Sequence, residues 1–538
     1  MREYQRQVLL IGCGPAADAA PGPDTIGFKA YNLWRMARAG MPVPQAFVLG
    51  TAFCREFFQH HRKPVAGLRE LLQARIRDLE RASGLAFGGV RKPLLLSVRS
   101  GAPVSMPGML ETVLDIGVCD ATVPGLLRLT GNPRLVWDSY RRLVQSFAEV
   151  VHQLPAGRFE AALVARIQEA GVESARELDF QSLRTLTRDY LGLYEEMVGQ
   201  AFPQQPLDQL EAAVVAVWAS WAAVKAAEYR RLNQLADDLG TAVTVQRMVY
   251  GNAGGTSGAG VAFTRDPASG EPLLYLDFMF NAQGDDVVSG RLSMPDGDRL
   301  GTVLPAAFQD VAKAARLLEK EFRDMQEFEF TVQDGKLYVL QTRTGKRNAW
   351  AALRIAIDQV EEGLIEPAAA VERLAGIDLA TIQRLHVVPA SAGAALCRAV
   401  GAGGSVAIGE IALDSDRARE VAAAGRHAIL VRDSTSTEDI TGIVAAVGIL
   451  TAAGGRTAHA AVVARQLEKV CVVGCDVLSV DLPHRRCSVA GRQLSEGDVL
   501  SLDGETGDVF VGSVAVTTEK PEANLARALR WREERQAA

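Results

Sequence analysis

A glycine-rich turn that leads into a histidine at the start of a helix is the strongest constraint on this 538-residue chain. Residues 454–461 read GGRTAHAA, in which the glycines permit a sharp turn and Thr457 is the expected N-cap. A helix N-terminus carries partial positive charge and free N–H donors, so it binds phosphate and disfavours imidazolium. His459 is therefore predicted to be neutral and nucleophilic near pH 7, as a carrier of a phosphoryl group must be. A lone histidine at a helix start is more often an ordinary surface residue, so the rest of the chain has to decide.

The composition is that of a soluble globular protein with several domains. The length predicts about three or four domains, and the chain is 48% hydrophobic and 23% charged. The net charge of −6 argues against nucleic acid as a main partner. We find no apolar run near the roughly 18 residues of a membrane span, and no signal peptide at the N-terminus. A cytoplasmic location without a membrane partner is the resulting expectation.

Seven cysteines are scattered through the chain, and their number and spacing indicate reduced thiols. Cys471 and Cys475 lie four residues apart, but no second pair completes a zinc-binding set. We therefore expect no metal ion at the cysteines.

Helix-like and strand-like patterns divide the chain into segments of different character. The two patterns mix in the first part of the chain, the stretch from roughly 120 to 240 is helical, and strand and turn signals resume over 243–343. A charged, alanine-rich helical stretch over about 349–374 follows as a connector. The segment 386–515 alternates β-rich runs with glycine turns and short helices. The expected fold class is therefore α/β, in the form of an α+β multidomain protein.

Three separate segments contain residues suited to a phosphate site. Lys29 lies in GFKA (27–30), and Arg99 lies at the end of the strand-like SVRSGA (97–102). Residues 251–260 include five glycines, whose backbone N–H groups can approach phosphate oxygens closely. Each segment alone has an ordinary alternative, namely a solvated lysine, a structural ion pair or a simple hairpin turn.

The segment 327–343 predicts a β-hairpin with one charged face. In EFEFTV the glutamates share one face and the aromatic residues share the other. A three-residue turn at 333–335 would place Glu327 opposite Gln341 and beside Arg343, whereas a two-residue turn would separate these sets. We expect the three-residue turn because it gathers acids, amide and guanidinium around one charged ligand. Carboxylates beside a polyphosphate usually bind Mg²⁺, and the alternative is a solvent-facing hairpin with a surface ion pair.

Taken together, these segments resemble the pyruvate, phosphate dikinase family in motif order across about residues 25–515. The similar pieces are SVRSGAPVSMPGMLETVLDIG (97–117), GVAFTRDPASGE (260–271), NAQGDDVV (281–288), EFEFTVQDGKLYVLQTRTGKR (327–347) and ILTAAGGRTAHAAVVARQ (449–466). The resemblance implies a domain order. It consists of an ATP-grasp nucleotide-binding domain over 1–348 with a helical insertion at about 120–240, a helical connector over 349–385, a swivelling phosphohistidine domain over 386–515 and a helical tail over 516–538.

The resemblance also implies which residues bind ATP and which residue attacks it. The implied ATP contacts are Lys29, Arg99, Gly254, Gly255, Thr256, Ser257, Glu327, Glu329, Gln341 and Arg343. Of these, Glu327 and Glu329 would hold Mg²⁺. His459 would take a diphosphoryl unit from ATP and release AMP. Inorganic phosphate would then remove one phosphoryl group as diphosphate, and the other would pass to pyruvate.

A few positions depart from the family pattern. Glu327 stands where an aspartate is usual, Ala458 replaces a serine, and Thr437 replaces a proline. The stretch 401–404 also matches poorly. None of these departures removes a residue that the chemistry needs. Thr457 is a candidate for regulatory phosphorylation, because the matching threonine is phosphorylated in some relatives.

The family's acceptor domain is a (β/α)₈ barrel, which takes roughly 200–250 residues. Only about 20 residues follow the segment 386–515. We therefore expect a separate barrel protein that binds pyruvate or phosphoenolpyruvate as the partner. Two alternatives stay open: a different small-molecule or protein acceptor, and a non-catalytic nucleotide-binding subunit. Self-association into a homo-oligomer also stays open.

Overall fold

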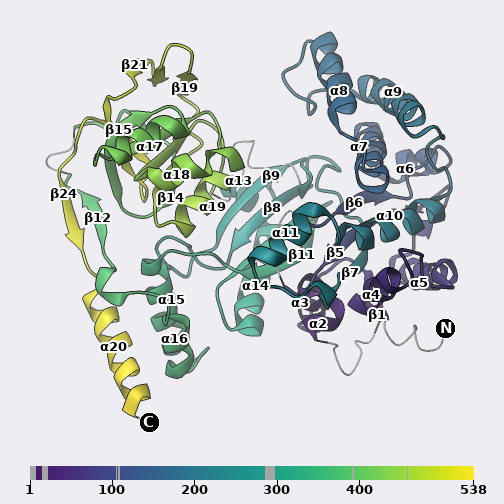
Figure 1. Cartoon of the computed structure of the whole chain (residues 1–538), viewed down its shortest axis with the longest axis horizontal. Helices are drawn as coiled ribbons and strands as arrows, with labels where there is room; N and C mark the ends of the chain where they lie inside the picture. The colour runs from purple at the N-terminus through teal and green to yellow at the C-terminus, as the bar shows by residue number, and fades with distance from the viewer. Residues whose placement is uncertain are drawn as a thin grey trace. The chain divides into compact units, whose positions relative to one another are not determined.

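The computed structural model describes residues 8–14, 22–104, 106, 109–284, 287, 297–389, 393–456 and 458–537. At 297, 298, 437, 459 and 537 it describes the backbone alone. The chain divides into two compact units, of which the first is formed by residues 1–254 with 338–341 and the second by 255–337 with 342–538. Figure 1 follows the chain through the helices and strands of both units.

A five-stranded sheet forms the centre of the first unit, in the order β1-β2-β7-β5-β6. Its strands are β1 (Val8–Ile11), β2 (Ala46–Leu49), β5 (Leu96–Gly101), β6 (Thr112–Ile116) and β7 (Ala242–Arg247). Each neighbouring pair is antiparallel. Apolar and β-branched residues dominate these strands because both faces of the sheet are covered, and β2 is buried at all four positions.

Helices fill the rest of the first unit. Those before β6 are α2 (Pro23–Ile26), α3 (Phe28–Arg38), α4 (Thr51–Gln59) and α5 (Leu68–Ser83), and a short pair β3 (Ala86–Phe87) and β4 (Pro93–Leu94) follows them. Those between β6 and β7 are α6 (Val123–Thr130), α7 (Pro133–His152), α8 (Gly157–Ala170), α9 (Phe180–Val198), α10 (Pro206–Ser220), α11 (Val224–Leu232) and the 3₁₀ turn η1 (Asp237–Leu239). Side chains of Asn132 and Asp179 cap the starts of α7 and α9, and left-handed glycines end α6, α8 and α9.

One helical stretch, Pro206–Leu232, is long enough to cross a membrane and contains an 18-residue window with a mean hydropathy of 1.4. This finding corrects the expectation that no apolar run approaches the length of a membrane span. Half of that window is buried inside the fold, and the stretch divides into α10 and α11. The core helix of a soluble protein passes the same test, so the stretch is weak support for a membrane segment.

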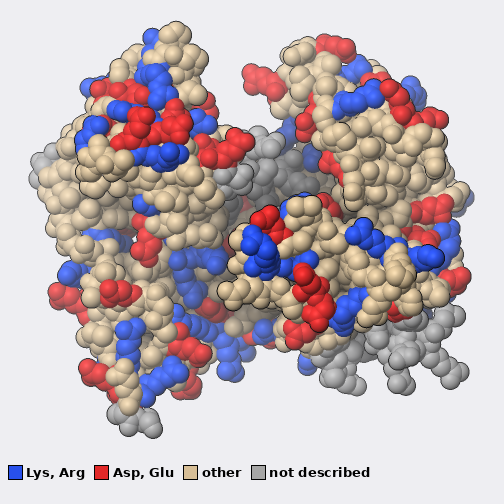
Figure 2. Space-filling model, viewed as in Figure 1, with Lys and Arg blue, Asp and Glu red and all other residues tan. Residues whose placement is uncertain are grey.

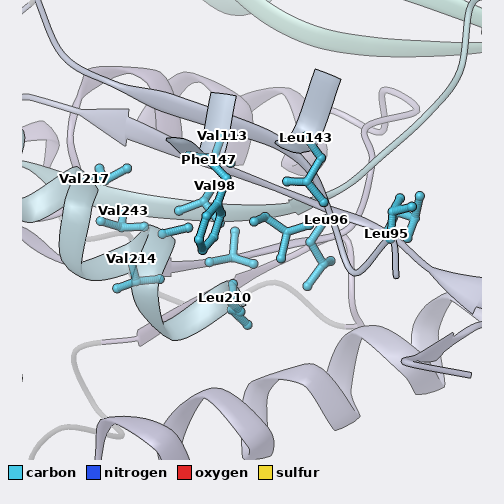
Figure 3. Close-up of a cluster of buried hydrophobic side chains, with 14 of the residues drawn as sticks. Leu95, Leu96, Val98, Val113, Leu143, Phe147, Leu210, Val214, Val217 and Val243 are labelled. Carbon is cyan, nitrogen blue, oxygen red and sulfur yellow. The ribbon is translucent and has the colours of Figure 1, made fainter. Parts of the chain in front are cut away.

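A hydrophobic core joins the sheet of the first unit to the helices between β6 and β7. Figure 3 shows its centre, where Leu96, Val98 and Val113 of the sheet lie together with Phe147 of α7 and Val214 of α10. Each of these side chains is at most 1% exposed. Because burial of one such side chain contributes roughly 1.5–3 kcal/mol, the helices and the sheet stabilise each other.

The second unit contains a four-stranded sheet in the order β11-β10-β8-β9, although residues 338–341 of β11 belong to the first unit. Its elements are β8 (Gly258–Phe263), β9 (Tyr275–Phe280), β10 (Gln326–Gln333) and β11 (Lys336–Thr344), with helices α13 (Gly297–Val303) and α14 (Pro305–Phe322) between β9 and β10. On one face the rings of Phe278 and Phe330 stack 5.9 Å apart over glycines of β8. A Cβ at Gly260 would lie 2.5 Å from the Phe330 ring, so the position of this ring requires glycine at 260.

The turn between β10 and β11 has two residues. Asp334 and Gly335 have positive φ values of 51° and 75°, and the strands end at Gln333 and begin again at Lys336. These angles are those of a type I′ turn, so the expected three-residue turn is wrong. An Asp-Gly pair strongly prefers the two-residue turn, and this local preference outweighs the argument from a shared ligand.

Connector helices and a two-stranded ribbon follow β11. The elements are α15 (Ala349–Glu361), α16 (Pro367–Arg373), η2 (Leu379–Thr381), β12 (Arg384–Val387), its antiparallel partner β24 (Val516–Glu519) and the last helix α20 (Glu522–Ala537). Ala528 of α20 is buried in one cluster with Leu353, Ile357 and Leu374. The last helix therefore shares a core with the connector helices, beside which it lies in Figure 1.

An eight-stranded sheet forms the last domain of the second unit, in the order β13-β23-β22-β15-β16-β17-β18-β14. Its strands are β13 (Cys397–Arg398), β14 (Val400–Gly403), β15 (Val406–Ala412), β16 (Ala428–Arg432), β17 (Gly448–Thr451), β18 (Val470–Val473), β22 (Val499–Asp503) and β23 (Asp508–Val511). Strands β15 to β18 are parallel, and α17 (Ser415–Ala423), η3 (Thr437–Asp439), α18 (Ile440–Ala445) and α19 (His459–Gln466) connect them. A small sheet of β19 (Leu478–Asp481), β20 (Arg486–Val489) and β21 (Arg492–Ser495) completes the domain.

Helices mixed with parallel and antiparallel sheets confirm the predicted α/β multidomain fold class. Strand β14 is irregular between Gly401 and Gly403, which falls within the stretch that departs from the family pattern. On the face of the molecule drawn in Figure 2, basic and acidic side chains are interspersed.

Trp218 of α10 tests how much the first unit depends on its aromatic core. This side chain is fully buried and lies 6.3 Å from the ring of Phe53 and 5.8 Å from that of Phe57. Trp218→Ala should lower the free energy of unfolding by about 3–5 kcal/mol in urea titrations, because it leaves a large cavity. Leu232→Ala, at a position 66% exposed, is the matched control and should change it by less than about 0.5 kcal/mol. Similar losses in the two variants would contradict the prediction.

Candidate functional site

Three of the predicted ATP-binding residues line one pocket of the first unit. Lys29 comes from α3, Arg99 from β5 and Gln341 from β11, and Leu33 and Leu340 add an apolar wall. Two cations and an amide beside apolar side chains can bind an anionic ligand that also carries an uncharged group. The structure thus brings together residues that are more than 300 positions apart in the sequence.

A close backbone contact holds α3 against the end of β5. Gly27 has a φ of 78°, and a Cβ there would lie 2.0 Å from the carbonyl oxygen of Gly101. The next residue, Phe28, donates its N–H to the carbonyl of Ala102 at 2.9 Å. Only glycine permits this approach, so the spacing between the lysine of α3 and the arginine of β5 depends on it.

Acidic side chains gather on one face of the sheet of the second unit. Glu327 and Glu329 share this face because they lie two residues apart on β10. Glu329 pairs with Val261 of β8, and Val261 pairs with Asp277 of β9, so Asp277 lies on the same face. Asp277 is 3% exposed and was not singled out from the sequence. A lone acid inside the apolar strand YLDFMF was the signal that could have found it.

Arg343 contacts the acidic face through Glu327. Its Nη2 lies 2.5 Å from Glu327 Oε1, and the glutamate side chain is 7% exposed. Burial disfavours the charge of Arg343, but the hydrogen bond and charge of Glu327, with the charge of Glu329, outweigh it and raise the pKa of the guanidinium. The expected contact between acid and guanidinium therefore forms although the expected turn does not.

The same face carries an aromatic row that contacts the domain containing His459. Tyr275 pairs with Phe263 and Phe263 pairs with Glu327, so the three lie side by side across β9, β8 and β10. The guanidinium of Arg456 lies 4.8 Å from the centre of the Tyr275 ring. Arg456 belongs to the turn 454–461, so this turn approaches the face that bears the acids.

Helix α19 begins at His459, and its N-cap is Ala458, which makes no side-chain cap hydrogen bond. The expected cap at Thr457 is therefore corrected by one position, and Thr457 itself and the side chain of His459 lie outside the described residues. Alanine has no acceptor to offer the first N–H groups of the helix. These groups are consequently suited to an anion such as a phosphoryl group.

The glycine-rich loop 251–260 is exposed at its tip and buried where it enters β8. A Cβ at Gly254 or Gly255 would meet no atom within 4 Å, and Gly255 and Thr256 are exposed. Ser257 is fully buried, and its hydroxyl accepts a hydrogen bond of 2.9 Å from the backbone N–H of the β10–β11 turn. The exposed tip suits a loop over phosphates, whereas Ser257 fastens the loop to the hairpin.

A magnesium site was predicted at Glu327 and Glu329. Among the described residues, no group of three or more His, Cys, Asp or Glu side chains is arranged to hold a metal ion. Mg²⁺ on a nucleotide needs only one or two carboxylates, because phosphates and water supply its other ligands. The two glutamates fit this requirement because both present carboxylate oxygens on the same face of the sheet. Arg343 contacts one of these oxygens, Oε1 of Glu327.

A buried acid lies beside the start of the glycine loop. Asp115 is 3% exposed, has an unusual positive φ of 59° and accepts a hydrogen bond from the Tyr250 hydroxyl at 3.3 Å. Burial, partly offset by the charge of Arg142 and reinforced by Asp138, raises the pKa of Asp115 to about 7. Tyr250 directly precedes the loop 251–260, so this hydrogen bond ties the start of the loop to β6.

Two protein-family models match the chain. Residues 65–300 match the pyruvate phosphate dikinase AMP/ATP-binding domain, and residues 425–507 match the mobile domain of PEP-utilising enzymes. The first range contains Arg99, Asp277 and the glycine loop, and the second contains His459.

Curated relatives are similar over nearly the whole chain. The pyruvate, phosphate dikinase of Clostridium symbiosum is 42% identical over 509 residues, which are 94% of this chain and 58% of that protein. That of Rhizobium meliloti is 40% identical over 97% of this chain and 60% of that protein. Pyruvate, phosphate dikinase 2 of Zea mays is 39% identical over 98% of this chain and 60% of that protein. The chain thus spans about three fifths of the length of these relatives.

Together with a cationic pocket, an acidic sheet face and a turn before a helix-start histidine, the two family matches define a nucleotide-binding protein with a mobile domain of the phosphohistidine type. Over the ranges that match, the chain belongs to the pyruvate, phosphate dikinase family. This result confirms the family inferred from the sequence motifs.

A substitution at Gly27 tests whether the close backbone contact between α3 and β5 supports nucleotide binding. Gly27→Ala should weaken ATP binding at least about tenfold, measured by calorimetry, because the new Cβ forces α3 away from β5. Gly171→Ala is the matched control, since Gly171 also has a positive φ of 65° but a Cβ there would meet no atom within 4 Å. Equal ATP affinity in the two variants would refute the role of this contact.

The pH dependence of stability tests the raised pKa of Asp115. Its pKa is raised from 3.8 to about 7, so between these values the folded protein retains a proton that the unfolded chain loses. The group's contribution to stability is therefore complete at low pH and is lost as pH rises toward about 7, by up to about 4 kcal/mol. Asp115→Asn keeps an acceptor for Tyr250 but cannot titrate.

Urea unfolding of the wild type and of Asp115→Asn should be compared from about pH 4 to pH 8. The stability of the wild type should fall relative to the variant as pH rises, and the difference should level off above about pH 7. Parallel curves would show that the carboxyl titrates at its ordinary value.

Proposed function

We propose that this chain catalyses the nucleotide half-reaction of a pyruvate, phosphate dikinase. In this proposal ATP is the donor, His459 is the nucleophile and AMP is the first product. The observation that carries the proposal is the contact of the turn 454–461, through Arg456 and Tyr275, with the sheet face bearing Glu327. The family matches for both domains support it.

The chemistry is two transfers that balance. A ring nitrogen of His459 bonds to the β-phosphorus of ATP, and the bond from that phosphorus to the oxygen of the α-phosphate breaks, so AMP leaves with that oxygen. Inorganic phosphate then takes the terminal phosphoryl group and leaves as diphosphate. A monophosphorylated histidine remains for the acceptor.

The proposed residues have different roles in this step. Lys29 and Arg99 offset the negative charge of the phosphates, which grows on the transferred group and on the leaving oxygen. Mg²⁺ held by Glu327 and Glu329 would supply further positive charge and orient the phosphate oxygens. The N-terminus of α19, where Ala458 makes no side-chain cap hydrogen bond, would stabilise a phosphoryl group on His459.

Pyruvate, which the names of the matched relatives contain, is the proposed acceptor. A barrel domain supplied by a separate protein is the proposed pyruvate-binding partner, and a different small-molecule or protein acceptor is the alternative. Adding pyruvate to the phosphorylated protein, with and without such a domain, distinguishes the two. A cytoplasmic location, regulation through Thr457 and self-association are likewise proposals.

The half-reaction predicts label on one histidine. The protein should be incubated with Mg²⁺ and ATP labelled at the β-phosphate, and acid-labile label on the protein and released AMP should be measured. We expect about one AMP for each labelled chain, loss of label in His459→Ala, and labelled diphosphate when orthophosphate is added. Omission of Mg²⁺ should abolish labelling.

His427→Ala is the matched control, because His427 is an exposed histidine in the same domain, and it should label like the wild type. Absence of label in a protein that still binds ATP would overturn the catalytic proposal and favour a nucleotide-binding subunit. Label that persists in His459→Ala would overturn the assignment of the nucleophile.

A further inference from the structure

Two cysteines of the last domain lie in contact although they are 78 residues apart in sequence. The Sγ atoms of Cys397 and Cys475 are 3.5 Å apart, and both residues are free thiols. Cys397 begins the two-residue strand β13 at the edge of the eight-stranded sheet, and Cys475 follows β18 near its other end. The proposed half-reaction uses neither thiol.

The two thiols differ in the way that a reactive pair requires. Cys397 is partly exposed, whereas Cys475 is 1% exposed. The hydrogen bond from Cys475 holds the pKa of Cys397 below its usual value, while that same bond and burial raise the pKa of Cys475. An accessible thiol with thiolate character beside a buried second thiol is the arrangement of oxidation-sensitive cysteine pairs.

The backbone beside Cys475 contacts the start of the turn that leads to His459. The N–H of Cys475 donates to the carbonyl of Thr451 at 3.0 Å, and Thr451 is the last residue of β17. A Cβ at Gly474 would lie 2.8 Å from the carbonyl oxygen of Gly454, the first residue of the turn. A bond that fixes Cys475 therefore restrains the segment from which the turn departs.

We propose that Cys397 and Cys475 form a reversible intramolecular disulfide that restrains the turn in front of His459; its effect on phosphorylation rests on the proposed function. The thiolate of Cys397 attacks one sulfur of a small-molecule disulfide and displaces one thiolate, which takes up a proton. Cys475 then loses its proton and attacks the mixed disulfide at Cys397, releasing the second thiol. Two protein thiols are oxidised and one external disulfide is reduced to two thiols.

The geometry permits the bond with a small movement. A disulfide needs an S–S distance of about 2.05 Å, so the sulfurs must approach by about 1.5 Å. Strand β13 is short and lies at the sheet edge, where it pairs only with β23 in the described part of the sheet. It can move toward Cys475 without breaking the centre of the sheet.

The whole chain should be treated with oxidised glutathione and then measured by thiol titration and intact mass. Seven thiols should fall to five, the mass should fall by about 2 Da without a glutathione adduct, and a non-reducing digest should yield the peptides of Cys397 and Cys475 joined. Cys397→Ser and Cys475→Ser should each prevent the bond. Cys13→Ser, which changes another partly exposed cysteine, should leave it intact.

Amide hydrogen exchange over residues 452–456 should slow at least about threefold on oxidation, and dithiothreitol should reverse this change. Labelling from ATP should slow in parallel in the wild type, but in neither serine variant. Seven titratable thiols after treatment, or glutathione retained on Cys397, would overturn the disulfide. A disulfide that leaves exchange unchanged would overturn the restraint. If the reduced protein takes no label, the proposed function fails, while mass and exchange still decide this inference.

Discussion

The position of the turn before His459 depends on one buried guanidinium. Arg465 is 2% exposed, and its Nη1 donates to the carbonyls of Arg456 and Ala402. Its charge lies 5.3 Å from the centre of the Phe263 ring. Nε and Nη2 have no hydrogen-bond partner among the described residues, so this charge is costly to bury and the cation–π contact offsets only part of that cost. In return, the side chain of Arg465 fixes the position of the turn, because it contacts the turn, strand β14 and the sheet that bears the acids.

The alignment of acids on one face of that sheet depends on packing at the opposite face, where Phe278 and Phe330 lie. A slip of one residue between strands would exchange the two faces and bury the acids among apolar groups. The rings of Phe278 and Phe330 prevent such a slip, because they fit only over Gly258 and Gly260 of β8. The apolar packing thus fixes the strand register that aligns Glu329 with the acid of β9.

Sequence motifs predicted which distant residues come together better than they predicted the backbone conformation around them. Lys29, Arg99 and Gln341, which come from three separate sequence segments, line one pocket. The three-residue turn was predicted in order to place charged residues around one ligand. The backbone conformation of a turn is instead set by the φ preferences of its own residues, here Asp334 and Gly335.

The residues that sequence reasoning missed became visible only through pairing across the sheets. Asp277 has no acidic neighbour in its strand, and only the register of β8 with its two neighbours aligns it with Glu329. The contact between Cys397 and Cys475 closes a loop of 78 residues, for which no local pattern exists. The N-cap of α19 is Ala458, one residue after the expected Thr457, and this difference is within the range by which helix ends vary.

The distribution of charge also bears on the form in which a nucleotide binds. Glu327, Glu329 and Asp277 on one face would repel a bare polyphosphate, since like charges at short range in a partly buried site are weakly screened. A nucleotide that carries Mg²⁺ would present a cation to these carboxylates. If ATP binds as proposed, the acidic face would discriminate against free ATP, and Arg343 beside Glu327 would reduce the repulsion without removing the oxygen donors that a metal ion needs. In the proposed half-reaction the carboxylates would thus favour the metal–nucleotide complex over free ATP.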